Sequence, residues 1–293
     1  MMKRLLVFAT ICLCMSCKKD KELAPLSNQY IEEFEQYKIK TATNRIKYLE
    51  LCGLHKIKTG IHKFGKDSTN AFVVDAEASA DFIGAFQNEN DNVLFVAQEG
   101  VDIRASNDSI ISKISMERDS LGNSFRLYHN GLSWQIITRD NAPYLRVWDS
   151  KNPFVTQFKG YEHFELDPQF IFNAEFNYFD TEKTEEVSSQ LGVNASTKFI
   201  GRLTFEYQGT TYNLDVGRNG FTMVSDLTTG EESYGGGRYV YVDLPKENGA
   251  VVLDFNRLYN PPCSFSKYTT CLYPPRQNNL PFKIEAGETN SRL

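Results

Sequence analysis

The feature that most constrains the fold is a succession of short segments, after Gly53, in which apolar and polar residues alternate. In FIFNAEFNYF, residues 170–179, nearly all the apolar side chains fall at every second position and would point to one face of a strand. LTFEYQGTTYNLDV shows the same alternation on either side of Gly209, as a β-hairpin does. Many short strands separated by turn residues predict a mainly β fold, either an antiparallel β-sandwich or a barrel-like sheet.

A short N-terminal α-helix is expected before these strands. Tyr30 and Phe34 fall at helical spacing, Ser27 has the character of a helix start, and Gly53 that of a stop. We expect this helix to pack against the segment that follows it. The chain of 293 residues is long enough for one large β domain or two smaller ones. We expect the helix and a small β region at residues 30–125 and a larger β domain at residues 126–293.

The N-terminus has the pattern of a secretory signal peptide. Lys3 and Arg4 precede the ten-residue apolar run LLVFATICLC, which is too short to span a bilayer as a helix. Ser16 and Cys17 then resemble the end of a bacterial lipobox, although Cys14 stands where Leu is usual. We therefore expect a lipoprotein signal peptide at residues 1–16, an acylated Cys17 and a flexible tether at 17–29. The alternative is an unlipidated secreted protein cut at another small residue.

Composition and motifs narrow the functional classes. The formal net charge of -5 argues against a nucleic-acid partner, because phosphate binding needs clustered Lys and Arg. The four histidines form no metal-ligand pair at helical spacing, and the sequence has neither a G-x-S-x-G elbow nor a Walker A loop. The sequence therefore predicts no metal site and no cofactor.

Two cysteines near the C-terminus, Cys263 and Cys271, lie in a proline-rich stretch. An oxidising envelope compartment favours a disulfide between them, and a bridge closing about nine residues would stabilise the fold by roughly 2.5 kcal/mol. A reduced structural pair, a metal site and a nucleophile remain open as alternatives.

Polar residues gather around these cysteines, at the ends of two expected strands. If the two strands were neighbours, their ends would converge and form a mouth for a polar ligand. The candidate ligand-binding residues are Glu232, Tyr234, Arg238, Asp254, Asn256, Arg257, Tyr259 and Asn260. The alternative is a structural network of arginine, carboxylate and amide groups that holds an irregular loop in place.

Three C-terminal segments closely resemble domain-of-unknown-function family 1684: TTGEESYGGGRYVYVDLP, VVLDFNRLYNPPCSFSKYTTC and NNLPFKIEAGE. Two earlier segments, YLELCGLHKIKTGIHKFG and FKGYEHFELDPQFIFNAEF, are also similar to the family, so the resemblance covers about residues 30–288. The sequence departs from the family at Leu272, Arg276 and His55. The resemblance implies the C-terminal polar motif and both cysteines, also in members without an export signal, and it implies no particular activity.

These observations predict a lipid-anchored protein of the Gram-negative cell envelope, attached to the outer membrane by its acyl chain. We expect a binding or structural module for a polar small molecule or glycan. The alternative is a hydrolase-type enzyme with Asp254 or Glu232 as acid/base, or with Cys263 as nucleophile. No catalytic residue is identified by a motif.

Overall fold

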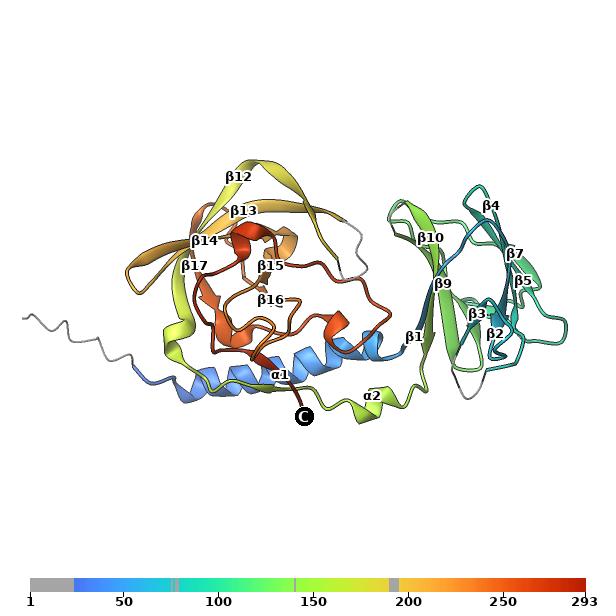
Figure 1. The fold of residues 1–293 in the computed structure, drawn as a ribbon, viewed down its shortest axis with the longest axis horizontal. Coiled ribbons are helices and arrows are strands. Elements are labelled where there is room, and N and C mark those ends of the chain that lie inside the picture. The colour runs from blue at the N-terminus through green and yellow to red at the C-terminus, as the bar shows by residue number, and fades with distance from the viewer. Residues whose placement is uncertain (1–23, 75, 77–78, 140, 190–194) are drawn as a thin grey trace, which may run out of the picture.

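The computed structural model describes residues 24–293 except 75, 77–78, 140 and 190–194, and this part of the chain forms two β-rich lobes (Figure 1). The N-terminal lobe spans residues 51–149 and the C-terminal lobe residues 161–292. Helix α1 (Asn28–Leu49) runs along the C-terminal lobe, and the short helix α2 (Phe154–Gln157) follows the N-terminal lobe. The expected signal peptide, Cys17 and the first part of the tether lie outside the described residues.

The N-terminal lobe consists of two five-stranded sheets. Sheet 1 has the order β1 (Leu51–Lys56), β10 (Ala142–Asp149), β9 (Leu132–Arg139), β8 (Leu127–His129), β6 (Arg104–Ala105). Sheet 2 has the order β3 (Phe72–Val73), β2 (Gly60–Gly65), β4 (Gly84–Glu89), β5 (Asn92–Ala97), β7 (Lys113–Ser115). Trp134 of sheet 1 contacts Phe64 and Phe95 of sheet 2, with ring centroids 5.2 and 5.5 Å apart. The predicted mainly β, largely antiparallel, sandwich-like fold is confirmed.

The expected domain boundary at residue 126 falls inside sheet 1. Strands β8, β9 and β10 follow that boundary, yet β10 pairs with β1, where Leu54 lies opposite Arg146. The N-terminal lobe therefore continues to Asp149. Local alternation marks a strand but does not say which sheet the strand joins, and this is why the sequence placed these three strands in the wrong unit.

The C-terminal lobe is built around the four-stranded sheet 3. Its order is β14 (Thr210–Gly217), β13 (Ala195–Tyr207), β12 (Ile171–Val187), β17 (Gly249–Asp254). Two short pairs complete the lobe: β15 (Phe221–Val224) with β16 (Arg238–Tyr241), and β11 (Tyr161–His163) with β18 (Glu288–Arg292). Phe172 packs against Phe205 and Phe255, with ring centroids 4.8 and 5.5 Å apart. Over the described residues each sheet stays open, and none closes into a barrel.

Helix α1 begins where the sequence predicted, because the Ser27 hydroxyl accepts a hydrogen bond from the Tyr30 amide at 3.1 Å. Its packing differs from the prediction. Tyr30 donates its hydroxyl proton to Asp254 at 2.8 Å, and the ring of Phe34 meets the edge of His163 at 5.8 Å between centroids. Most of the helix thus covers the C-terminal lobe, which is far away in sequence. Among the described residues, no helix combines the length and the apolar character that crossing a membrane requires.

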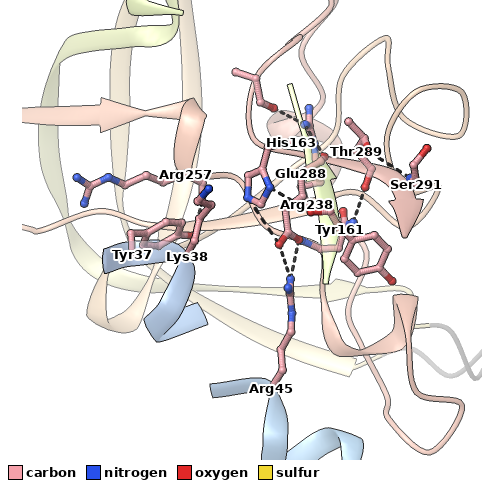
Figure 2. A network of polar contacts seen from close by, with 12 residues as sticks. Tyr37, Lys38, Arg45, Tyr161, His163, Arg238, Arg257, Glu288, Thr289 and Ser291 are labelled. Atoms are coloured by element: carbon pink, nitrogen blue, oxygen red, sulfur yellow. Dashed lines mark hydrogen bonds and ion pairs between the residues drawn. The ribbon is translucent and has the colours of Figure 1, made fainter. Parts of the chain in front are cut away.

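A buried ion pair joins α1 to the last strand. The Arg45 guanidinium donates to both carboxylate oxygens of Glu288, at 2.7 and 2.6 Å, and both residues are at most 6% exposed (Figure 2). The Arg45 guanidinium also lies over the rings of Tyr161 and Phe265, 5.5 and 5.6 Å from their centroids. Glu288 further accepts the backbone N–H of Asn260 at 2.7 Å. One carboxylate thus connects α1, β18 and the loop after β17.

We expect the Glu288→Gln variant to be strongly destabilised, by about 3–5 kcal/mol, because Arg45 would keep a buried positive charge without its counterion. Denaturant unfolding followed by circular dichroism measures this change. Glu182→Gln is the matched control, since Glu182 pairs with Arg218 at the surface, and little change is expected there. A wild-type midpoint for Glu288→Gln would show that the buried pair does not hold α1 in place.

Candidate functional site

The eight candidate residues do not meet in one mouth, because the two strands that were expected to be neighbours belong to different sheets. β16 pairs with β15, whereas β17 pairs with β12 at the edge of sheet 3. Arg238 begins β16 and Asp254 ends β17. Among the eight, three line the main cleft of the described chain: Arg257, Tyr259 and Asn260.

Arg238 lies in the interior of the C-terminal lobe with 0% exposure. Its guanidinium pairs with Asp226 at 2.9 Å and donates to the backbone carbonyl oxygens of Ile284, at 2.9 Å, and of Ala286. A further hydrogen bond of 3.2 Å goes to the carbonyl of Glu288. Arg238 therefore ties β16 to the C-terminal segment and cannot reach a ligand in the cleft.

Asp254 and Asn256 hold the turn after β17. Asp254 caps the 3-10 helix Phe255–Arg257 by accepting the Asn256 amide at 3.0 Å, and it pairs with the Arg257 Nε at 3.1 Å. Asn256 is 1% exposed, and its side chain exchanges two hydrogen bonds of 3.0 Å with the backbone of Asp167. Both residues thus belong to the structural network that was weighed as the alternative.

Glu232 and Tyr234 lie apart from the cleft lining. Glu232 pairs at the surface with Lys283. The ring of Tyr234 lies against Gly236, where an added Cβ would come within 2.5 Å of it. This close approach gives a physical reason for glycine at position 236.

A disulfide links Cys263 and Cys271, whose Cα atoms lie 5.9 Å apart. The bridge packs against Met223 and Tyr239 in a small buried cluster beside the cleft. In this form neither sulfur is a thiolate, so Cys263 does not act as a nucleophile.

The cleft lies between α1 on one side and β16 with the loop after β17 on the other, and its volume is about 670 Å³. Helix α1 contributes Tyr37, Lys40, Thr41, Asn44, Arg45, Lys47 and Tyr48. The C-terminal lobe contributes Phe221, Tyr239, Val240, Tyr241, Asp243, Arg257, Tyr259, Asn260, Pro262 and Phe265. This lining is rich in aromatic rings and cations and contains a single carboxylate, that of Asp243.

Two of the tyrosines that line the cleft have parallel rings. The rings of Tyr241 and Tyr259 are stacked, with centroids 6.4 Å apart and an interplanar angle of 7°. Tyr241 is 58% exposed, whereas burial raises the pKa of the Tyr259 phenol well above its ordinary value. The Tyr259 phenol is therefore neutral at physiological pH and can donate a hydrogen bond.

Asn260, a residue of the cleft lining, has a buried side-chain acceptor that finds no partner in the described structure. Its side chain is almost fully buried, with 1% exposure, and its amide nitrogen donates to the Thr289 carbonyl at 2.7 Å. The Oδ1 atom finds no donor among the described residues. An unsatisfied buried acceptor costs about 1–3 kcal/mol.

Sequence reasoning missed the helical half of the cleft. Tyr37, Lys40, Asn44 and Tyr48 recur every three or four residues and therefore share one face of α1. The polar and aromatic character of this face was a usable signal. Nothing in the sequence, however, indicated that the face would lie opposite β16.

The Asp254→Asn variant tests the structural role of Asp254 through pH. Burial raises the pKa of Asp254, although the Tyr30 hydrogen bond and the Arg257 charge oppose the shift. The protonated form therefore stabilises the fold below the unfolded pKa, and this stabilisation is lost as pH rises through the folded pKa. Asparagine cannot ionise. We therefore expect the melting temperature of the variant to rise relative to that of wild type as the pH increases from about 3 to 7.

Asp243→Asn provides the control, because Asp243 is an exposed carboxylate of the same lobe. Melting curves of the two variants and wild type across that pH range give the comparison. Parallel wild-type and Asp254→Asn profiles would show that Asp254 ionises as freely in the folded chain as in the unfolded one.

Comparisons with known proteins concern the C-terminal lobe. Residues 156–289 match the family model described as "Protein of unknown function (DUF1684)". The match is narrower than the expected resemblance over residues 30–288, since α1 and the N-terminal lobe lie outside it.

Among solved structures, the chain is similar to the solution NMR structure of an uncharacterized protein from gene locus rrnAC0354 of Haloarcula marismortui. The two are 27% identical, the likeness covers 46% of this chain and 78% of that one, and the TM-score is 0.39. Comparison with curated proteins gave no match. The match over residues 156–289, which contains the disulfide and the polar turn after β17, supports the DUF1684 family for this part of the chain.

Proposed function

We propose that this chain is a lipid-anchored cell-envelope protein that binds an acidic small molecule or glycan in the cleft between α1 and β16. The observation that carries the proposal is the exposed ring of Tyr241, which lines this cleft together with Lys40 and Lys47. A sugar ring can rest one of its faces on the Tyr241 ring while an acidic group of the ligand meets the lysine side chains.

The charges in the cleft favour an acidic ligand. Lys40 and Lys47 line it against the single carboxylate of Asp243, while Arg45 already pairs with Glu288 and Arg257 with Asp254. Lysine and arginine side chains attract carboxylate, sulfate or phosphate groups, and they do so most strongly where water is partly excluded. Aromatic rings together with cations thus fit an acidic sugar better than a neutral one.

The arrangement favours binding over hydrolysis. The two carboxylates considered as a general acid or base already have structural partners. Asp254 caps a turn and accepts a hydrogen bond from Tyr30, and Glu232 pairs with Lys283. A general acid and a general base must both lie within hydrogen-bond reach of the reacting group.

The proposed anchor would hold the cleft near a membrane. Acylated Cys17 would stand eleven residues before Asn28, the first residue of α1. At most about 3.6 Å per residue, the tether limits the start of the helix to roughly 40 Å from the bilayer surface. A ligand in this cleft would therefore be met close to the membrane.

Removing the Tyr241 ring is expected to weaken binding about tenfold or more, because an aromatic anchor contributes at least roughly 1.4 kcal/mol. The probes are oligogalacturonate and alginate oligosaccharides, with uncharged maltooligosaccharides for comparison, and calorimetry at low salt measures affinity. Tyr241→Ala should melt like wild type, since the ring is 58% exposed. Lys40→Gln should weaken the acidic probes alone.

Tyr273→Ala is the matched control, because Tyr273 is an exposed tyrosine that does not line the cleft. Equal affinity of Tyr241→Ala and wild type for a probe that wild type binds would remove the cleft from the binding reaction. Failure of wild type to bind any acidic probe would contradict the proposed ligand class.

The anchor is tested separately from the cleft. We expect wild-type chain expressed in a Gram-negative host to incorporate labelled fatty acid and to sediment with membranes, and Cys17→Ser to lose both properties. Cys14→Ser serves as control, because Cys14 belongs to the expected signal peptide. Label that persists in Cys17→Ser would place the acyl chain elsewhere.

A further inference from the structure

Three arginines share the outer face of sheet 1. Arg146 in β10 lies opposite Gln135 in β9, and the Gln135 side-chain oxygen accepts a hydrogen bond from the Arg126 Nε at 3.3 Å. Arg126, Gln135 and Arg146 therefore form one row across neighbouring strands, which are spaced about 4.8 Å apart. Arg139, at the end of β9, joins the same face because it alternates with Gln135.

This face looks toward the C-terminal lobe. Leu145 and Val147 alternate with Arg146 and lie in the core of the sandwich, so Arg146 points the other way. Sheet 1 lies between sheet 2 and the C-terminal lobe (Figure 1). Trp148 of the same strand donates its indole N–H to the Lys47 carbonyl of α1 at 3.1 Å, which places the end of the helix beside the arginines.

The arginines carry charge that the described chain does not neutralise. Among the described residues, no carboxylate forms an ion pair with Arg126, Arg139 or Arg146. All three are partly buried, and the Arg146 Nε is buried without a hydrogen-bond partner. The remaining contacts bring no negative charge: Arg126 stacks on Trp148, 3.8 Å from the ring centroid, and Arg139 donates to a backbone carbonyl.

The charged form of the Arg146 guanidinium is destabilised by its surroundings. Burial, followed by the nearby Arg139 charge, lowers the pKa of Arg146 to about 10, although Tyr48 acts in the opposite direction. Burial also lowers the pKa of Arg139. Positive charges held together and away from water destabilise the fold unless an anion accompanies them.

We propose that Arg126, Arg139 and Arg146 form a second binding site, which takes a phosphate, sulfate or carboxylate group of a small ligand between the two lobes. Guanidinium groups bind such oxyanions through paired N–H donors in a plane. A small ligand fits better than a membrane or a nucleic acid. The site faces the second lobe, and binding a phosphate backbone or a membrane surface needs Lys and Arg clustered over a wider area than three residues provide.

The site is separate from the cleft of the proposed function. Its arginines come from sheet 1, whereas the cleft is lined by α1 and the C-terminal lobe. Binding at one site can therefore fail while binding at the other succeeds.

Pyrophosphate and sulfate, titrated at low salt, are the probes, and calorimetry with melting curves is the measurement. We expect saturable pyrophosphate binding that raises the wild-type melting temperature. Arg146→Gln should bind at least tenfold more weakly. In the absence of anion this variant should melt no lower than wild type, because it removes an uncompensated charge. A purely structural arginine would give a lower melting temperature with and without the anion.

Two further variants make the test specific. Arg104→Gln is the matched control and should bind like wild type, because Arg104 belongs to the same sheet but pairs with Asp102 at 2.9 Å. Asp140, next to Arg139 in sequence, lies outside the described residues, and Asp140→Asn should keep the binding of wild type. Three results would overturn the proposal: no saturable binding by wild type, equal loss in Arg104→Gln and Arg146→Gln, or binding that appears only in Asp140→Asn. Loss of pyrophosphate binding in Tyr241→Ala would move the site to the cleft.

Discussion

The buried pair of Arg45 and Glu288 is the interaction on which the arrangement of the C-terminal lobe depends. Removing two charges from water is costly, and the pair offsets this cost through two short hydrogen bonds and the aromatic rings around the guanidinium. Glu288 also fixes the backbone of Asn260, so the same carboxylate sets the floor of the cleft. Together with the Tyr30–Asp254 hydrogen bond, this ionic contact holds the helical wall of the cleft against the loop wall.

Buried arginines have different polar partners in the two lobes. In the C-terminal lobe, Arg238 meets Asp226 and several backbone carbonyl oxygens, so its charge is used for structure. On sheet 1, Arg146 has no such partner among the described residues. A protein keeps an uncompensated charge where function offsets the cost, and in this chain both the unpaired Asn260 acceptor and the arginine face lie beside the end of α1.

Local chemistry made part of this structure predictable. Alternation identified the strands of sheet 3, Ser27 marked the start of α1, and the expected oxidising compartment favoured the bridge between Cys263 and Cys271. The partner of each strand was not predictable, because β16 and β17 carry the same alternation whether or not they pair. For that reason the polar candidates were expected to converge, whereas most of them hold turns and strands together.

The first and last residues of the N-terminal lobe lie close together. The Asp149 amide donates to the Glu50 carbonyl at 2.8 Å, and the Asn152 side chain donates to the Leu49 carbonyl at 3.0 Å. About one hundred residues thus lie between α1 and the C-terminal lobe, against which α1 packs. The lobe thus has the connectivity of an insertion between α1 and the C-terminal lobe. A shorter chain that joined residue 50 directly to residue 150 would keep α1, its ion pair and the residues that line the cleft.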